Sequence, residues 1–321
     1  MHSQKNFCET FEMKPQVPLK IICAGECMIE LRGTCGGNQD SNLYRSSFAG
    51  DVLNFSVYLK RLYRDSNIKF LSAIGSDSMS KKMHDFFSIE GIDTSLIARS
   101  RKKTIGLYTI ENDELGERSF TYWRSDSAAR QMFHLIDEDL FEDAIKSADY
   151  FYFTGITLAI IDQSSREKLF WTAKQFTEKG KKVIFDPNYR PHLWDRKEDA
   201  VEQIKRGYRS CNILLSSIQD EQLLRKSSSV DDVLNNLLRY QIDEIVLTNG
   251  AGVITGNVNG KQLQISPTKP LSIIDTTAAG DGFNAGYIAS RHAGNSPELS
   301  IRAASKQAAL IVASAGAVIT K

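Results

Sequence analysis

The sequence predicts an α/β protein in which helices pack against a mostly parallel central sheet and a small β-sheet forms a lid. Three observations lead to this prediction. Short apolar runs alternate with amphipathic helical runs from Ala148 onward. Earlier in the chain, two β-rich runs, 104–110 and 118–123, flank a turn-like segment. Finally, a loop of small residues leads into a helical run at Asp281, an arrangement suited to binding an anion.

Composition excludes several classes of protein. With 321 residues, the chain can bury a large core in one big domain or two smaller ones. Its formal net charge of +1 gives no broad attraction to nucleic acid or to a membrane surface, so neither is expected as a partner. No apolar run is long enough to span a bilayer, and the N-terminus lacks the apolar core of a secretory signal. We therefore expect a cytoplasmic protein.

The five cysteines are expected to be reduced thiols, because their number is odd and their spacing shows no disulfide framework. Cys23, Cys27 and Cys35 lie close together, but without C-x-x-C pairs or a nearby histidine they do not favour zinc. The five histidines show no ligand or relay spacing either. We expect them on the surface or in packing positions.

The first third of the chain is expected to hold two core strands and two helices after a loose extension. Residues 1–19 carry two prolines and no period, which is typical of a loosely attached segment. The expected strands are 20–24 and 69–74, and the expected helices are 52–63 and 80–90, the second ending at Gly91. Two extended runs, 28–31 and 43–48, are separated by a Gly- and Asn-rich segment.

The runs 104–110 and 118–123 predict a hairpin, because the segment 111–117 between them contains Asn-Asp and Gly. Together with 28–48 they predict a small β layer inserted into the α/β body, which would serve as a lid. On a two-residue period Tyr122 and Arg124 share one face, where a ring and a guanidinium could grip an organic acid. The alternative is an ordinary solvated cross-strand face.

The second half alternates regularly between strands and helices. Expected strands are 150–154, 182–185, 212–215 and 244–248, and expected helices are 164–178, 197–209, 230–240 and 299–315. Asn188 and Arg190 follow a strand end, where they either face a ligand or form a structural turn. The glycine loop after Thr248 superficially resembles a dinucleotide-binding loop. Because 253–258 and 261–265 are β-like, that loop opens a hairpin, which weakens an oxidoreductase interpretation.

The stretch 273–290 carries the main functional signal. It begins as a strand at the β-branched Ile273 and Ile274, passes through small residues, and enters a helical run at 282–292. Unpaired amides and the helix dipole at such a start attract phosphate. Since a carboxylate repels phosphate, Asp281 is expected to act on the reaction partner, as a base beside an anion hole. The alternative without chemistry is a turn at Asp281 and an N-cap cluster at 275–277.

The sequence resembles the ribokinase-like (PfkB) sugar kinases, and within them the 2-keto-3-deoxygluconate kinases, over nearly all of residues 20–321. The most specific motif is DTTAAGD, 275–281, which is similar to the family's D-T-x-G-A-G-D. Motifs of the subgroup are GECMIEL, GLYTIE, GERSFTYWR, GITLAI, SREKL and FDPNYRPHLW. The resemblance implies a three-layer α/β/α fold in a single kinase domain, with lid strands from about 28–48 and 104–124.

The resemblance also implies roles for individual residues. Asp281 matches the base that takes the proton of the sugar hydroxyl, and the amides of Ala278, Ala279, Gly280 and Asp281 match the anion hole. The residues implied to bind the sugar acid are Gly50, Asp51, Asn54, Tyr108, Tyr122, Arg124 and Arg190. The residues implied to bind ATP are Thr248, Asn249, Gly250, Ala251, Gly252 and Ser305.

Three single positions and one short segment depart from the family pattern. Ala278 replaces the more usual glycine, and Ala49 replaces the first glycine of the sugar loop. Thr248 stands where many relatives have lysine, and 217–220 stand where many have N-x-x-E. The last departure leaves the metal ligands undefined, although ATP and Mg²⁺ are the implied cofactors and a monovalent cation such as K⁺ stays open.

The implied activity is phosphorylation of the terminal (C6) hydroxyl of 2-keto-3-deoxygluconate by ATP. One alternative is another sugar kinase of this family, such as a fructokinase. The other is a non-catalytic protein that binds a sugar acid or a nucleotide. Exposed edges of the lid sheet would also suit a homodimer.

Overall fold

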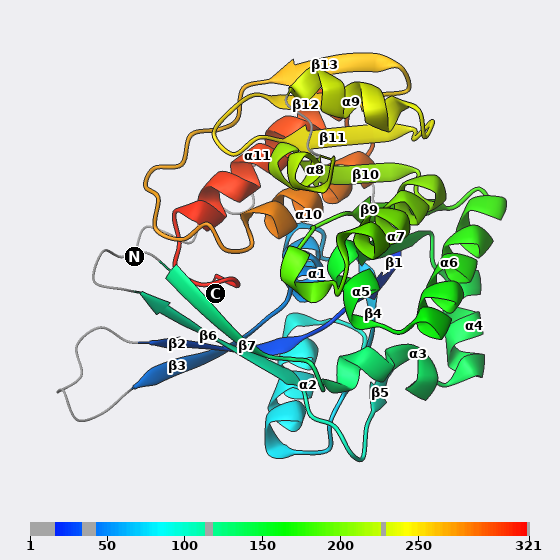
Figure 1. Cartoon of the computed structure of the whole chain (residues 1–321), viewed down its shortest axis with the longest axis vertical. Helices are drawn as coiled ribbons and strands as arrows, with labels where there is room; N and C mark the ends of the chain where they lie inside the picture. Colours follow the sequence, from blue (N-terminus) through cyan, green and yellow to red (C-terminus); the bar gives the residue numbers. More distant parts are fainter. Residues whose placement is uncertain (1–16, 34–42, 113–117, 226–228, 320–321) are drawn as a thin grey trace.

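Two separate sheets organise the chain (Figure 1). The computed structural model describes residues 17–33, 43–112, 118–225 and 229–319. The strands of the large sheet are β1 (Lys20–Ala24), β4 (Asn67–Ile74), β5 (Ile97–Arg99), β8 (Tyr150–Thr154), β9 (Lys182–Asp186), β10 (Ile213–Ser217), β11 (Glu244–Thr248), β12 (Ile254–Val258) and β13 (Lys261–Ile265). The strands of the small sheet are β2 (Met28–Gly33), β3 (Tyr44–Ala49), β6 (Gly106–Asn112) and β7 (Arg118–Trp123).

The large sheet has the strand order β13-β12-β11-β10-β9-β8-β1-β4-β5, and the small sheet has the order β3-β2-β6-β7. All pairs from β11 to β5 are parallel, whereas β12 and β13 add an antiparallel hairpin at one edge. In the small sheet β2 pairs with β6 in parallel, and β3 and β7 form antiparallel edges. The mostly parallel central sheet and the separate small β-sheet are therefore confirmed.

Helices cover both faces of the large sheet, because its strands are apolar on both sides. Along β1, Ile22 and Ala24 face one core, and Ile21 and Cys23 face the other. The first core includes η1 (Ala128–Gln131), α3 (Met132–Leu135), α4 (Glu138–Ser147), α5 (Gly155–Ile160), α6 (Gln163–Glu178), α7 (Lys197–Ser210), α8 (Ile218–Arg225) and α9 (Val230–Leu238). The second includes α1 (Asp51–Leu62), α2 (Ser78–Glu90), α10 (Ala279–His292) and α11 (Pro297–Val312). The three-layer α/β/α architecture is confirmed.

Most of the predicted elements occur within one to three residues of the expected bounds, because their sequences carry clear end signals. At the start of α2, Asp77 accepts hydrogen bonds from the amides of Met79 and Ser80. At its end, Gly91 takes the left-handed conformation with φ of 73°. The sequence did not predict β5, α3, α4, α5 or α8, most of which are too short to complete a periodic pattern. The short helix η2 (Pro191–Leu193) was not predicted either.

The stretch 273–278 differs from expectation. No strand occurs there among the described residues, and the side chain of Ile273 is 77% exposed. The amides of Ile274 and Asp275 instead both donate to the carbonyl of Val312, at 2.9 and 3.1 Å, so this segment runs against the end of α11. Helix α10 also begins at Ala279 rather than at Gly282. The small residues are thus partly inside the helix and not only in the loop before it.

The expected N-terminal extension reaches less far than residue 19. Leu19 is buried, and the carbonyl of Val17 accepts hydrogen bonds from Tyr63 Oη and His292 Nε2. Residues 1–16, the Gly- and Asn-rich segment 34–42 and most of the hairpin turn lie outside the described residues. Within the described part of the chain, no helix is both long enough and apolar enough to cross a membrane.

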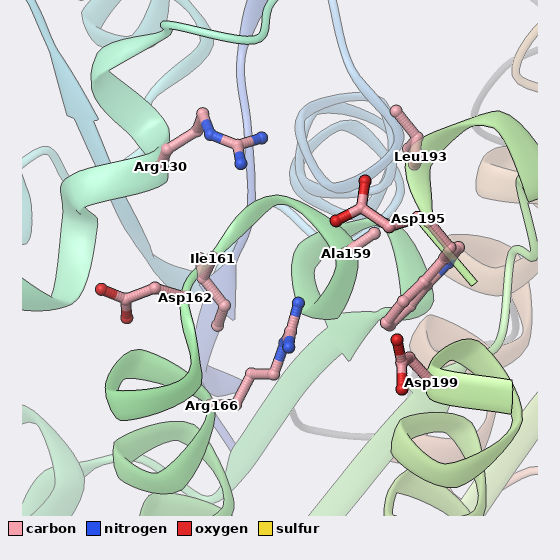
Figure 2. Close-up of a pocket in the computed structure, with 9 residues that line it drawn as sticks. Arg130, Ala159, Ile161, Asp162, Arg166, Leu193, Asp195 and Asp199 are labelled. Atoms are coloured by element: carbon pink, nitrogen blue, oxygen red, sulfur yellow. The ribbon is translucent and has the colours of Figure 1, made fainter. Parts of the chain in front are cut away.

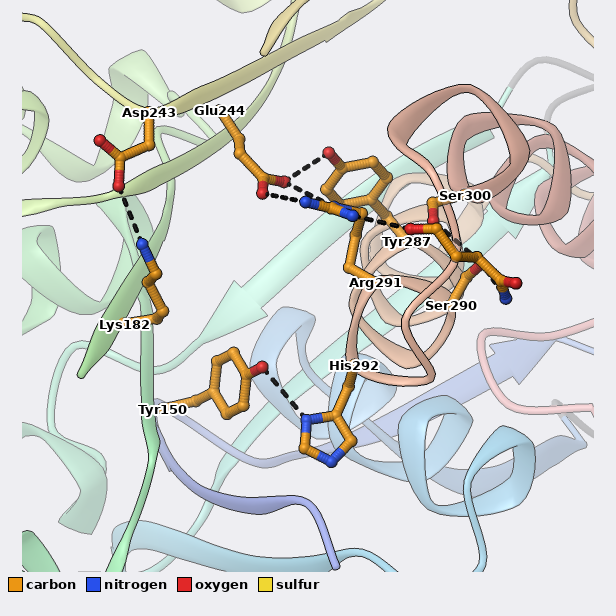
Figure 3. A network of polar contacts seen from close by, with 10 residues as sticks. Tyr150, Lys182, Asp243, Glu244, Tyr287, Ser290, Arg291, His292 and Ser300 are labelled. Atoms are coloured by element: carbon orange, nitrogen blue, oxygen red, sulfur yellow. Dashed lines mark hydrogen bonds and ion pairs between the residues drawn. The ribbon is translucent and has the colours of Figure 1, made fainter. Parts of the chain in front are cut away.

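The C-terminal end of α10 is fastened to the start of β11 by a polar network (Figure 3). Glu244 accepts a hydrogen bond from Tyr287 Oη at 2.6 Å, and from Arg291 Nε and Nη2 at 3.1 and 2.6 Å. The neighbouring ion pair between Lys182 and Asp243, at 2.9 Å, is far more exposed to solvent. Asp281 lies at the other end of α10. By holding the C-terminal end of this helix, the Glu244 network also helps to fix the position of the Asp281 carboxyl group.

We expect Glu244→Ala to lower the free energy of unfolding by about 1.5–3 kcal/mol, since it removes hydrogen bonds to a charged acceptor that is mostly shielded from water. Asp243→Ala is the matched control, because its exposed ion pair should contribute no more than about 1 kcal/mol. Urea denaturation of both variants measures the difference. Equal losses in the two variants would contradict a special role for the Glu244 network.

Candidate active site

The N-terminus of α10 forms the centre of the candidate site. Ala278 adopts the left-handed conformation with φ of 62°, and the helix begins at the next residue. The amide of Ala279 makes a 3.3 Å hydrogen bond to the carbonyl of Thr276. A Cβ atom added to Gly280 would meet nothing within 4 Å, so the loop is open on that side. The amides best suited to an anion are therefore those of Gly280 and Asp281 in the first helical turn.

Asp281 is buried and meets the start of α1. Its Oδ2 atom accepts a hydrogen bond from Asn54 Nδ2 at 2.8 Å, which joins two predicted site residues from opposite ends of the sequence. Burial raises the pKa of the Asp281 carboxyl group to about 8, and the negative charge of Asp51 adds to this effect. The hydrogen bond from Asn54 and the charge of Arg190 oppose it. A carboxyl group with such a pKa can exchange a proton near neutral pH.

Gly50 precedes α1 in a conformation that requires glycine. Its φ is 146°, and a Cβ atom there would lie 2.5 Å from the carbonyl oxygen of Glu26. The next residue, Asp51, accepts hydrogen bonds from Thr154 Oγ1 at 2.6 Å and from Asn188 Nδ2 at 3.1 Å. The structure therefore gathers Gly50, Asp51, Asn54 and Asp281 at the carboxyl ends of the parallel strands, where α/β sheets bind ligands.

A further carboxyl group, Asp186, lies near both Asp281 and Asp220, close enough for both charges to act on it, and the sequence analysis did not assign Asp186 to the site. Asp186, at the end of β9, accepts hydrogen bonds from Asn284 Nδ2 and from the amide of Asn188. Burial and the negative charges of Asp220 and Asp281 raise its pKa well above the usual range. The position of Asp186 at a strand end was the signal that could have identified it. Among the described residues, no group of three or more His, Cys, Asp or Glu side chains forms a ready metal site.

The small sheet presents Tyr108 and Tyr122 side by side, with ring centroids 5.5 Å apart. Tyr108 is buried and donates a 2.5 Å hydrogen bond to Glu30 Oε2. Tyr122 is partly exposed and stacks on His192 of the main body, with centroids 5.6 Å apart. His192 therefore occupies a packing position, next to a predicted site residue. Burial and the positive charges of Arg124 and Arg190 lower the pKa of His192, as expected for a region of positive potential.

Arg124 follows β7 and is buried rather than solvated. Its Nη2 atom lies 2.5 Å from Glu26 Oε2, and its guanidinium carbon lies 5.7 Å from the centroid of the Tyr122 ring. Arg190 is more exposed and lies 3.3 Å from Asp220 Oδ1. The solvated-face alternative therefore fails for Arg124. Both arginines are already paired with carboxylates, which would hold them in place for an acidic ligand.

The loop predicted to lie under ATP does open a hairpin, with β12 following it. Thr248 ends β11 and donates to the carbonyl of Ser216 at 3.3 Å, and the amide of Gly252 donates to the carbonyl of Asn249 at 2.7 Å. Gly250 has a positive φ of 54°. Ser305 is buried in α11, and its hydroxyl accepts a 2.7 Å hydrogen bond from the amide of Thr268. Ser305 thus supports the segment after β13.

A separate pocket of about 250 Å³ is lined by residues of the segments 159–166 and 193–199, together with Arg130 (Figure 2). Its polar lining comes from Arg130, Arg166, Trp194, Asp162, Asp195 and Asp199. The guanidinium of Arg166 lies 5.4 Å from the Trp194 ring, and its Nε donates to the carbonyl of Leu158. None of the predicted site residues lines this pocket. Two guanidiniums face three carboxyl groups, so the lining does not favour the acidic ligand expected at the candidate site.

Comparisons with known proteins agree with this geometry. Residues 18–321 match the pfkB family of carbohydrate kinases. The chain is 36% identical over 304 residues to 2-dehydro-3-deoxygluconokinase of Dickeya dadantii, covering 93% of this chain and 96% of the relative. It is 36% identical over 307 residues to the protein of that name in Escherichia coli K12, covering 94% and 97%. The crystal structure of 2-dehydro-3-deoxygluconokinase from Thermotoga maritima has a similar fold, with a TM-score of 0.79 at 20% identity over 95% of each chain.

We expect Asp281→Asn to raise the melting temperature of the ligand-free protein, and to do so increasingly from about pH 4 to about pH 8. The folded protein retains a proton on Asp281 up to a pKa of about 8, whereas the unfolded chain loses it near the ordinary aspartate pKa of 3.8. The folded state thus binds more protons over this range, so wild-type stability falls as pH rises, and the amide variant escapes this loss. Thermal melts from pH 4 to 9 measure the gap.

The exposed Asp85 provides a matched control, because Asp85→Asn should leave the pH dependence of the melting temperature unchanged. A constant gap between wild type and Asp281→Asn across the range would show that the Asp281 carboxyl group ionises normally.

Proposed function

This chain belongs to the pfkB family of carbohydrate kinases, and from that premise we propose that it phosphorylates 2-keto-3-deoxygluconate with ATP. The product is the 6-phosphate, because the terminal hydroxyl accepts the γ-phosphoryl group. The observation that carries the proposal is the buried Asp281 at the start of α10, held by Asn54 beside open first-turn amides. The relatives named 2-dehydro-3-deoxygluconokinase, which match nearly the full chain, support the choice of sugar acid.

The proposed mechanism assigns one proton transfer to the protein. Asp281 accepts the proton of the C6 hydroxyl while the hydroxyl oxygen bonds to the γ-phosphorus, and the bond from that phosphorus to the bridging oxygen breaks to release ADP. The amides of Gly280 and Asp281 would donate hydrogen bonds to the transferred oxygens and so oppose their negative charge. Asn54 fixes the carboxyl group toward the acceptor. Closure of the small sheet would keep water away from the phosphoryl group.

Mg²⁺ is the metal that the proposal requires, and Asp186 and Asp220 are the residues we assign to hold it. They suit a divalent cation, because carboxylate oxygens are the ligands that Mg²⁺ prefers, and because burial and the negative charges of Asp220 and Asp281 raise the pKa of Asp186, so that a bound cation would stabilise its charged form. When bound, Mg²⁺ neutralises charge on the phosphate oxygens. The loop Thr248–Gly252 and the region of Ser305 are assigned to the nucleotide. A requirement for K⁺ is proposed from the family resemblance alone, and no residue is assigned to bind this ion.

The acid end of the substrate is assigned to the guanidiniums of Arg124 and Arg190 around Tyr122, with His192 packed beside them. Burial lowers the pKa of His192, and the positive charges of the two arginines lower it further. A carboxylate would gain charge-assisted hydrogen bonds from guanidiniums that Glu26 and Asp220 already orient.

Two further expectations are kept within the proposal. A homodimer through the small sheet is supported by the exposed Phe120 and Trp123 on the edge strand β7. The proposal also retains the expected cytoplasmic location, where ATP serves as a phosphoryl donor.

An ADP-release assay across 2-keto-3-deoxy sugar acids and neutral sugars tests the function directly. We expect turnover with the sugar acid, and we expect Asp281→Asn to lower kcat by a factor of about 10² to 10⁴ while nucleotide binding persists, because the variant cannot accept the proton.

Near-normal kcat in Asp281→Asn would rule out the base. Preference for fructose would point to a fructokinase, and binding of the acid without ADP release would point to a non-catalytic binding protein. Asp85→Asn controls for a general effect of losing a carboxylate.

We expect Arg190→Gln to raise KM for the sugar acid about tenfold or more, because a charge-assisted hydrogen bond contributes about 1.5–3 kcal/mol. KM for ATP and turnover of any neutral acceptor should change much less. Arg196→Gln is the matched control, since Arg196 is exposed and pairs only loosely with Glu198 and Asp199, at 3.7 and 3.9 Å. An unchanged KM for the acid would place the carboxylate elsewhere.

A further inference from the structure

An ion pair joins the small sheet to the loop that leads into α10, which we call the anion loop and define as residues 275–281. Arg32 Nη2, on β2, lies 2.7 Å from Asp275 Oδ2. The Asp275 side chain is fully buried, and its other contacts shape the loop: Oδ1 accepts the amide of Thr277 at 2.9 Å, and Oδ2 accepts the amide of Gly316 at 3.0 Å. One carboxylate therefore links the small sheet, the anion loop and the C-terminal segment.

Burial alone would raise the pKa of Asp275, but hydrogen bonds from Thr277 and Gly316, together with Arg32, lower it to about 2. Asp275 is therefore a true anion at neutral pH. Removing the guanidinium would leave this buried charge with less compensation, which is costly in a protein interior. The ion pair between Arg32 and Asp275 therefore holds the small sheet against the anion loop.

Apolar side chains also join the small sheet to the anion loop. Met28, Ala49, Tyr108 and Ile110 of the small sheet form a buried cluster with Ala317, and Ala278 of the anion loop packs against it. Ala278 is one of the few non-glycine residues with positive φ, a conformation that costs about 1–2 kcal/mol for an L-residue. Contact with the small sheet offsets that cost, so the shape of the anion loop depends on the position of the sheet.

The ion pair also continues toward the acid-binding side of the small sheet. Arg32 Nη2 lies 3.6 Å from Glu30 Oε1, and the other oxygen of Glu30 accepts the 2.5 Å hydrogen bond from Tyr108. The Tyr108 ring packs against Tyr122 at a tilt, and Tyr122 in turn stacks on His192. A continuous set of contacts thus runs from the anion loop through Arg32 to the residues assigned to the sugar acid.

We propose that Arg32 is a positioning residue that couples the acid-binding face of the small sheet to the anion loop, so that the sugar acid and ATP each strengthen binding of the other. This inference rests on the proposed kinase function. Such coupling is reciprocal, because each ligand favours the same arrangement of sheet and loop. Arg32 touches neither reacting group and acts only through Asp275 and Glu30.

The experiment measures the dissociation constant of a non-hydrolysable ATP analogue with Mg²⁺, in the absence and presence of saturating 2-keto-3-deoxygluconate. In the wild-type protein we expect the sugar acid to tighten analogue binding about fivefold or more, which is the usual lower range of such coupling. In Arg32→Gln we expect this factor to fall to about one, while the dissociation constant for the analogue alone changes little. Because the coupling is reciprocal, steady-state kinetics at saturating ATP should show a KM for the acid that rises by about the same factor.

Arg45→Gln is the matched control. Arg45 lies directly opposite Arg32 in the β2–β3 register and is exposed, so its loss removes the same charge from the same sheet. This variant should keep the wild-type coupling factor. Thermal melts of each variant show whether it is folded before binding is measured.

Chemical rescue separates positioning from a general loss of stability. In Arg32→Ala, millimolar guanidinium should restore coupling, because it can occupy the space beside Asp275, whereas it should not improve Arg45→Ala. Coupling that survives in Arg32→Gln, or that is absent from the wild-type protein, would overturn the inference. Failure of the wild-type protein to release ADP with any sugar acid would instead overturn the proposed function, and the two outcomes are distinct.

Discussion

The burial of the Asp281 carboxyl group is the constraint on which the surrounding structure depends. A buried carboxyl group is costly unless it is hydrogen-bonded, and Asn54 of α1 provides that bond. For Asn54 to reach it, α1 must begin where Gly50 passes close to the carbonyl of Glu26, and α10 must lie at a fixed angle to the sheet. The network around Glu244 holds the far end of α10 in place. Elements from both ends of the chain therefore meet at the Asp281 carboxyl group.

Much of the fold could be predicted from the sequence, because periodic apolar runs with clear end signals determine single elements. The strands β1, β8 and β11 coincide with the apolar runs that predicted them. The failure at Ile273 and Ile274 has a physical reason: β-branched residues favour a strand only where a neighbouring strand can pair, and here their backbone meets α11 instead. Short helices such as α3 contain too few residues to show a helical period in the sequence.

The candidate site was only partly predictable. Asp281 and the small residues before it stand in one contiguous motif, so residue types and family resemblance both indicated them. The residues that contact these predicted residues could not be found in the same way. Glu26 beside Arg124, and His192 beside Tyr122, come together only through tertiary packing, and nothing in their local sequence predicts it. The same holds for the raised pKa of Asp186, which arises from burial and from carboxyl groups on other elements.

Arg124 and Arg190, the two arginines assigned to the acid end of the substrate, are each paired with a carboxylate of the protein. This pairing has a cost and a benefit for ligand binding. The net attraction for an anionic ligand is smaller than two free guanidiniums would give, but each guanidinium is already oriented and loses less freedom when the ligand arrives. Selectivity is then a matter of shape as well as charge. An acid of the wrong geometry gains little from cations that cannot turn to meet it.

The contact between Arg32 and Asp275 also bears on protein engineering. Because one buried carboxylate serves both the small sheet and the anion loop, the sheet is not an interchangeable module. Grafting the acceptor-binding strands of a different sugar kinase onto this body would change substrate contacts and also remove the guanidinium opposite Asp275. A transplanted sheet would need to bring its own counter-ion, or the recipient loop would need redesign along with it.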